Sequence, residues 1–224
     1  MNKFITLIIC CFYACQLHAL PTGFVYLKDI DPSIIEDIKY HSSDNFIGRR
    51  IKGYNAAKCI LTYQAAYALS SLQKELNKKG MGFKVYDCYR PTMAVKNFIE
   101  WSQDIQDQQQ KNEYYPHINK ADFFKLGYVA EKSGHSRGST IDLTIVRFTP
   151  DHKAVELNMG THFDFMDETS HPLYKKSVAE VWKNRMFLRS LMLNGNFNPF
   201  PTEWWHFTLK DEPFPKTYFN FPVE

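Results

Sequence analysis

The chain has 224 residues, of which 44% are hydrophobic and 16% aromatic. That length allows one domain with a full hydrophobic core, and no shift in composition along the chain divides it into two. The formal net charge of +3, which includes Lys3 close to the N-terminus, is too near balance to indicate a nucleic-acid-binding protein.

The first residues predict an export signal. Lys3 precedes an apolar run, Phe4 to Cys15, of about twelve residues, which is the length of a signal-peptide core and shorter than the roughly twenty that cross a bilayer. We therefore interpret residues 1–19 as a signal peptide and residues 20–224 as one mature domain, exported to the periplasm without a stable membrane span. Lipid attachment at Cys15 is the alternative.

Two cysteines remain once the leader is removed. They are Cys59 and Cys88, and the other three lie in the leader. An exported protein meets an oxidising compartment, where an even pair can form a disulfide. Two separate buried thiols are the alternative, because a disulfide requires closely approaching Cα atoms.

The remaining chain alternates between helical and extended patterns without internal repeats. In chain order we predict a short helix over 33–39, a loop or hairpin over 45–54, a long helix over 56–79, a strand over 83–89, a helix from Pro91 to about Trp101, an exposed polar segment over 102–113, a short helix over 120–131, a strand over 141–148, a helix over 175–193 and a last strand over 204–209. Long helices mixed with separated strands, without regular alternation, indicate an α+β fold, expected as a small, mostly antiparallel sheet flanked by helices.

The stretch SGHSRGSTIDL places His135 and Asp142 seven residues apart. On one regular strand this odd spacing would point the two side chains to opposite faces. A turn at Arg137-Gly138 would let both reach one point. A catalytic zinc takes three protein ligands and leaves one position for water, so this pair would supply two of them. The alternative is a polar turn that leads into a strand.

The stretch PTEWWHF adds a third possible ligand, His206, and an acid, Glu203. The two tryptophans would lower the local dielectric and raise the pKa of the Glu203 carboxyl towards that of a useful base. Glu203 and His206 would point to opposite faces of a regular strand, so Glu203 must lie in the loop before it. An aromatic core strand with an exposed glutamate is the alternative.

The stretch YDCYRP places Arg90 directly before a proline, which favours an extended backbone at that residue. A fixed guanidinium at a strand end would stabilise an oxyanion that forms beside a metal. The alternative is an ordinary salt bridge on the surface.

Six stretches, taken in order, resemble the D-alanyl-D-alanine dipeptidase family of zinc peptidases. They are NFIGRRIKGY, YDCYRPTMAV, SGHSRGSTIDLT, MGTHFDFMDETSH, EWWHF and the tail DEPFPKTYFNFPVE. The likeness runs from about Phe24 to Glu224. It implies a single zinc-peptidase domain that cleaves the small dipeptide D-Ala-D-Ala into two D-alanines.

The resemblance also implies a role for each matching residue. One zinc ion per chain would be bound by His135, Asp142 and His206. Glu203 would act as general base and Arg90 would stabilise the transition state. Asp164 would hold the free amine of the substrate, with Tyr40 and Ser133 helping to bind it.

Two positions depart from the family pattern. Gly134 lies where the family often has a second serine, and Cys88 where it often has glycine. Neither departure touches the implied metal ligands. Two other functions remain open: a D,D-carboxypeptidase that trims peptidoglycan stem peptides, and a non-catalytic zinc domain that binds cell-wall peptides.

Overall fold

The structure is a computed structural model that describes residues 19–224. The predicted signal peptide, apart from Ala19, and the alternative lipid site at Cys15 therefore lie outside the described residues. Within the described part, no helix is both long and apolar enough to cross a membrane.

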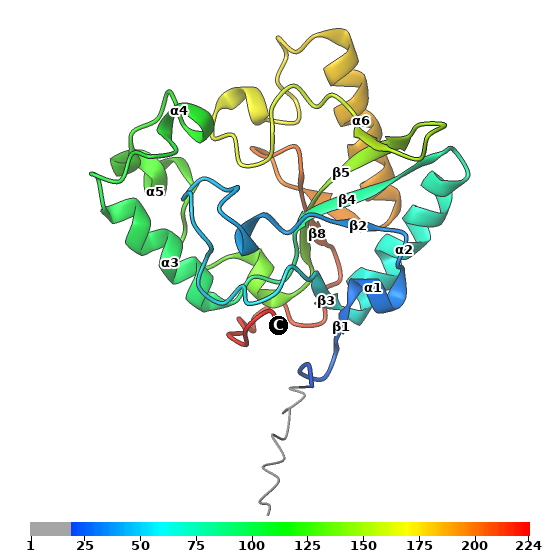
Figure 1. The fold of residues 1–224 in the computed structure, drawn as a ribbon, viewed down its shortest axis with the longest axis horizontal. Coiled ribbons are helices and arrows are strands. Elements are labelled where there is room, and N and C mark those ends of the chain that lie inside the picture. The colour runs from blue at the N-terminus through cyan, green and yellow to red at the C-terminus, as the bar shows by residue number, and fades with distance from the viewer. Residues whose placement is uncertain (1–18) are drawn as a thin grey trace, which may run out of the picture.

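Eight strands and six α-helices form the described fold (Figure 1). The strands are β1 (Phe24–Tyr26), β2 (Ile35–Glu36), β3 (Ile60–Thr62), β4 (Met81–Asp87), β5 (Thr140–Phe148), β6 (Ala154–Glu156), β7 (Phe197–Pro199) and β8 (His206–Leu209). The helices are α1 (Leu27–Ile30), α2 (Tyr63–Asn77), α3 (Thr92–Gln103), α4 (Lys111–Tyr114), α5 (Phe123–Leu126) and α6 (Ala179–Asn194). Short 3-10 turns occur at Lys39–His41, Lys120–Asp122, Gly134–Arg137 and Glu168–Ser170.

The main sheet has six strands and is mostly antiparallel. Its order is β2-β4-β5-β8-β7, and β6 pairs with the far end of β5. Only β2 runs parallel to its neighbour. Strands β1 and β3 form a separate antiparallel pair. The expected α+β fold is therefore confirmed.

Helices cover the sheet on both sides, as Figure 1 shows. In that view α3, α4 and α5 lie on the left of β4, β5 and β8, whereas α1, α2 and α6 lie on the right. Strand β5 is buried over Thr140–Val146, so it runs through the centre of the core. Strands that are buried on both faces can carry a polar side chain only where it is paired, and Asp142 lies on this part of β5.

The helix predicted over 120–131 ends at Leu126, and three further predictions differ from the structure. Residues 33–39 form no α-helix, because Ile35 and Glu36 pair with the edge of β4 instead. The helix predicted to begin at Ala56 begins at Tyr63, since residues 60–62 form β3. In both places a pairing with a distant strand outweighs local helical spacing, which is a common effect of tertiary context.

The third difference concerns α6. The helix predicted over 175–193 begins at Ala179, and the apolar residues Val178 and Trp182 are 65% and 40% exposed. Val181, Leu188 and Leu191 do face inward. Val178 precedes the first helical residue, so the apolar stripe begins one turn later than its spacing predicts.

Candidate metal centre

Three predicted ligands, from separate parts of the chain, meet at one point. His135 lies in the 3-10 turn Gly134–Arg137, Asp142 on β5 and His206 at the first residue of β8. Gly138 ends the turn with a φ of 84°, a left-handed conformation that glycine adopts without strain. The predicted turn between His135 and Asp142 is thus present, and β8 pairs His206 directly with Asp142.

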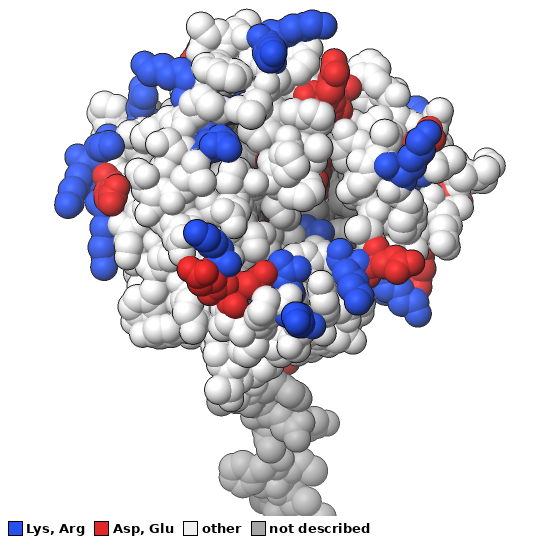
Figure 2. Space-filling view, turned by 180° about the vertical axis from the view of Figure 1, so that it is seen from behind, with Lys and Arg blue, Asp and Glu red and all other residues white. Residues whose placement is uncertain are grey.

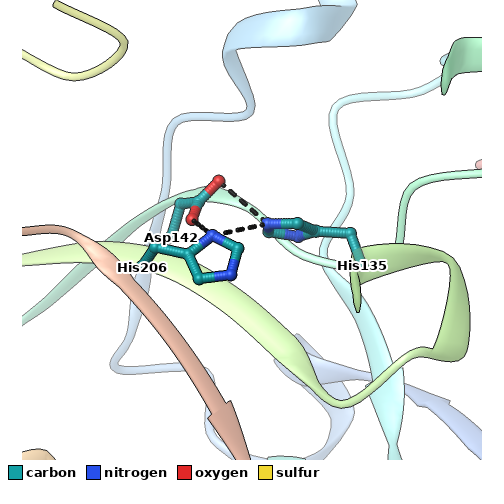
Figure 3. Close-up of side chains that lie close together, drawn as sticks. All are labelled: His135, Asp142 and His206. Carbon is teal, nitrogen blue, oxygen red and sulfur yellow. Dashed lines mark hydrogen bonds and ion pairs between the residues drawn. The ribbon is translucent and has the colours of Figure 1, made fainter. Parts of the chain in front are cut away.

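The three side chains point towards one another (Figure 3). His135 Nε2 lies 3.2 Å from Asp142 Oδ2 and 3.2 Å from His206 Nδ1. His206 Nδ1 lies 3.0 Å from Asp142 Oδ1. All three ligand atoms fall within 4.8 Å of one another.

This arrangement fits a zinc ion. Zinc–nitrogen and zinc–oxygen bonds of about 2.1 Å in a tetrahedron place neighbouring ligand atoms about 3.4 Å apart, close to the three distances found here. Asp142 Oδ1 is buried and has no hydrogen bond of acceptable geometry, although His206 Nδ1 is near it. An unpaired buried carboxylate oxygen is costly, and a cation would satisfy it.

The environment prepares His135 for a metal. Its Nδ1 lies 2.7 Å from the carbonyl oxygen of Cys88. A carbonyl only accepts hydrogen bonds, so Nδ1 donates its hydrogen and Nε2 presents its lone pair to Asp142 and His206. Burial lowers the pKa of His135, which keeps the ring neutral, as a metal ligand must be.

Glu203 lies beside the three ligands. It precedes β8, in the loop that the sequence required, and its Oε2 is 3.4 Å from His206 Nδ1. Burial raises the pKa of Glu203, and the charge of nearby His206 only partly offsets this. A carboxyl with a raised pKa, next to a metal-bound water, is suited to accept and return a proton.

Arg90 faces the same pocket, and a residue that the sequence analysis did not single out holds it there. Asp87 Oδ2 accepts hydrogen bonds from Arg90 Nε at 2.9 Å and lies 2.8 Å from Arg90 Nη2. The same oxygen is 3.4 Å from His135 Nδ1, and Asp87 Oδ1 accepts a hydrogen bond of 2.6 Å from the hydroxyl of Tyr54. One buried carboxylate therefore orients both the arginine and a metal ligand.

A signal for Asp87 was present in the sequence. It is a carboxylate in a predicted strand whose other residues are mostly apolar or aromatic, three residues before Arg90. A buried aspartate is almost always paired, which points to a cation close by in space. Burial raises the pKa of Asp87, and the neighbouring Arg90 opposes that shift.

Asp164 and Tyr40 lie together at another wall of the pocket. The Tyr40 hydroxyl donates a 2.8 Å hydrogen bond to Asp164 Oδ2, and both side chains are buried. Asp164 has a φ of 61°, an unfavourable backbone conformation for a residue that is not glycine. Burial raises the pKa of Asp164 well above its ordinary value, and the nearby Asp142 charge adds to this. The site is thus poised to gain a cationic partner for Asp164.

Ser133 also borders the pocket. Its hydroxyl accepts a 3.3 Å hydrogen bond from the backbone N–H of His135 and so caps the 3-10 turn that carries this ligand. All eight site residues expected from the sequence therefore lie around one cavity: Tyr40, Arg90, Ser133, His135, Asp142, Asp164, Glu203 and His206.

We call this cavity the metal pocket. Its volume is about 190 Å³, well below the 300–1,000 Å³ of common ligand sites. A larger cavity of about 590 Å³ borders Tyr86, His162 and Trp204, but it lacks the ligand cluster. The small volume of the metal pocket suits a small ligand.

Figure 2 shows a face of the molecule that is hollowed near its centre, where charged atoms are visible. The charged residues on this face form small clusters of both signs.

The two remaining cysteines form a disulfide. Cys59 and Cys88 are bonded, with their Cα atoms 5.3 Å apart. The bond joins the residue before β3 to the residue after β4, one position beyond Asp87. It therefore lies directly behind the metal pocket.

Comparisons with known proteins point to one family. The family model described as D-Ala-D-Ala dipeptidase matches residues 21–224. The D-alanyl-D-alanine dipeptidase of Enterococcus faecium is 40% identical over 202 residues, which cover 90% of this chain and 98% of that protein. The enzyme of the same name from Streptomyces coelicolor is 40% identical, with 89% and 98% covered. The one from Escherichia coli is 32% identical, with 84% and 85% covered.

Proposed function

The chain belongs to the D-Ala-D-Ala dipeptidase family, and from this premise we propose that it hydrolyses free D-Ala-D-Ala to two D-alanines outside the cytoplasm, using one zinc ion. The ligands are His135, Asp142 and His206. Glu203 is the general base, and Arg90 stabilises the transition state. Asp164, supported by Tyr40 and Ser133, binds the substrate.

The position of Asp164 is the observation that carries this proposal. Asp164 is a buried carboxyl in the same cavity as the ligand cluster, and a cation that binds beside it favours the charged form that burial disfavours. The free ammonium group of a dipeptide is such a cation. With the amine held at Asp164 and the metal in the same pocket of about 190 Å³, one residue fits before the bond to be cut.

A zinc ion bound there would polarise the carbonyl and lower the pKa of a bound water to about 7. Glu203 removes a proton from the attacking water and then delivers it to the departing amine, since its pKa is raised by burial. The Arg90 guanidinium, fixed by Asp87, faces the oxygen that becomes negative in the transition state. Tyr40 holds the Asp164 carboxylate in place through its hydroxyl.

Two observations support export. The leader carries the pattern of a signal peptide, although residues 1–18 lie outside the described structure. The Cys59–Cys88 disulfide is typical of proteins that fold in an oxidising compartment.

The decisive experiment compares two substrates. Purified residues 20–224 are given D-Ala-D-Ala or N-acetyl-D-Ala-D-Ala, with zinc or with a chelator, and released D-alanine is measured. We expect release from the free dipeptide only, and only with zinc, because an acetylated substrate leaves the buried Asp164 carboxylate unpaired.

Any other outcome of this experiment would indicate a different function. Cleavage of the acetylated dipeptide as well would indicate a D,D-carboxypeptidase. Zinc binding without cleavage of either substrate would indicate a non-catalytic domain that binds cell-wall peptides. The expected loss of the capped substrate is about 10⁴-fold, the scale on which sites built around a polar partner reject analogues that lack it.

A further inference from the structure

The backbone of Cys88 is part of the metal site, although its side chain is not. Its carbonyl oxygen accepts the hydrogen bond from His135 Nδ1 at 2.7 Å. Cys88 also stands between Asp87, which holds Arg90, and Arg90 itself. The placement of this peptide group, together with Asp87, therefore sets where the ring of His135 points.

Regular pairing within the main sheet does not extend to this peptide group. Strand β4 ends at Asp87, and its pairing with β5 is irregular between Val85 and Asp87. Beyond that end, the N–H of the same peptide group, which belongs to Tyr89, donates to the carbonyl oxygen of Ile60 in β3 at 2.9 Å. The N–H of Arg90 makes a long, 3.3 Å bond to the carbonyl of His135. The segment that orients a metal ligand thus lies where regular strand pairing has stopped.

The disulfide adds a covalent link to the hydrogen bond that ties this peptide group to β3. Cys88 is bonded to Cys59, which is fixed in turn by two hydrogen bonds. The carbonyl of Cys59 accepts from the N–H of Leu27 at 2.9 Å, and its N–H donates to Glu36 Oε2 at 3.2 Å. Both cysteines are buried. The bond therefore connects the segment behind His135 to the packed β1–β3 pair.

We propose that the Cys59–Cys88 disulfide is a positioning element of the metal site: it holds the Cys88 carbonyl against His135 and so strengthens metal binding. This inference rests on the proposed metal site. Partners that orient metal ligands commonly contribute 10- to 100-fold in metal affinity. Because both sulfur atoms are buried, reductants do not reach them in the folded protein, and the bond acts as a permanent brace rather than a switch.

The test measures metal affinity, not only activity. Zinc dissociation constants are determined by competition with a chromogenic chelator for the wild type and for the double variant Cys59→Ala/Cys88→Ala. We expect the variant to bind zinc about 10-fold more weakly, at the lower end of the usual range for such partners, because the carbonyl is loosened and not removed. Added zinc should restore its kcat towards the wild-type value.

A matched control separates positioning from general loss of stability. Leu76→Ala removes a buried side chain from α2, and no residue of α2 lines the metal pocket. It should lower the melting temperature, as core truncations do, and leave zinc affinity within about 2-fold of wild type. The single variant Cys59→Ala removes the disulfide but keeps the Cys88 side chain, and it should weaken zinc binding to the same extent. It replaces the double variant in the measurement if the double variant does not fold.

Equal zinc affinity in the wild type and in a folded disulfide variant would overturn the inference. The proposed function fails in a different way. It fails if the wild type binds no zinc, or if His206→Ala leaves zinc binding unchanged. A wild type that binds zinc and cleaves the dipeptide, beside a disulfide variant with unaltered affinity, would overturn the positioning role alone.

Discussion

Glu203 and Asp164 are both carboxyl groups whose pKa is raised by burial, but their surroundings suit them to the different roles proposed for them. Glu203 stands next to a metal ligand, 3.4 Å from His206. Asp164 bonds to a tyrosine and awaits a positive partner. Burial alone does not distinguish a general base from a substrate-binding group. The residue next to each carboxyl distinguishes them.

Replacing Glu203 tests the base directly. We expect Glu203→Gln to lower kcat/KM by about 10²- to 10⁴-fold, because the amide cannot accept a proton from water. Zinc content, measured by metal analysis, should stay at that of the wild type. The control is Glu180→Gln, an exposed residue in the first turn of α6. A loss of activity smaller than about 10-fold, or a similar loss in the control, would remove Glu203 from the mechanism.

Replacing Asp164 should separate stability from activity. A carboxyl with a raised pKa binds its proton more tightly in the folded chain than in the unfolded chain. Its contribution to stability is therefore complete below the unfolded pKa of about 3.9 and declines as the pH rises through the folded pKa. Asparagine does not titrate. The melting temperature of metal-free Asp164→Asn, relative to wild type, should increase from pH 5 to pH 8, while cleavage of D-Ala-D-Ala is lost.

The control for this prediction is Asp151→Asn. Asp151 is exposed, and the hydrogen bond from Lys153 lowers its pKa, so its replacement should give no increase over the same pH range. A difference between Asp164→Asn and wild type that is constant with pH would show that the carboxyl is not held in its protonated form.

At the scale of single elements, the 3-10 turn Gly134–Arg137 decides the geometry of the site. It turns His135 back towards Asp142, and Gly138 closes it in the left-handed region. A Cβ added at Gly138 would lie 2.2 Å from the ring of Phe24. Two requirements, backbone conformation and space, therefore meet at this glycine.

The two requirements can be separated by experiment. Gly127 ends α5 with a φ of 82°, close to the 84° of Gly138, but nothing lies within 4 Å of a Cβ added there. Gly127→Ala should cost about 1–2 kcal/mol of unfolding free energy, from backbone strain alone. Gly138→Ala should cost at least about 1 kcal/mol more, since overpacking adds to the strain, and should also weaken zinc binding. Denaturant unfolding measures both variants, and equal costs would refute the clash with Phe24.

At the scale of the whole molecule, the C-terminal tail joins parts of the site that are distant in sequence. The N–H of Phe219 donates to Ser136, next to His135, and the carbonyl of Phe219 accepts from Thr92, two residues after Arg90. The ring of Phe221 stacks on Tyr89 with centroids 4.1 Å apart. In Figure 1 the C-terminus accordingly lies close to β1 and β3. The tail thus stabilises both segments that carry site residues.

Shortening one side chain of the tail should reveal this role. We expect Phe221→Ala to lower the unfolding free energy by about 3 kcal/mol, the lower end for such truncations because the ring is half-buried. The melting temperature should fall by about 6–12 °C for a domain of this size. Phe221→Leu preserves most of the volume and should cost less than about 1.5 kcal/mol. Calorimetry compares the two, and equal stability of all three proteins would show that the tail is only peripheral.

The chemistry proposed for this protein came from the resemblance of six stretches to one family, and the short spacings within them carried two structural requirements. The odd interval between His135 and Asp142 required a turn, and the pair Glu203 and His206 required a loop before a strand. Both are present. The strands β4 and β5 and the helix α3 also lie close to their predicted positions, and α2 ends close to its predicted end, since each has a clear local period.

The remaining features depend on contacts between residues that are far apart in the chain. The bond between Tyr40 and Asp164 spans 124 positions, and local patterns carry no information on such a pairing. The same holds for β2, where a strand partner replaced the helix that residues 33–39 favoured, and for Asp87, whose role follows from Tyr54 and Arg90 around it. Sequence determined which groups are available for catalysis. Tertiary structure decided which of them meet, because burial and long-range pairing act only in the folded chain.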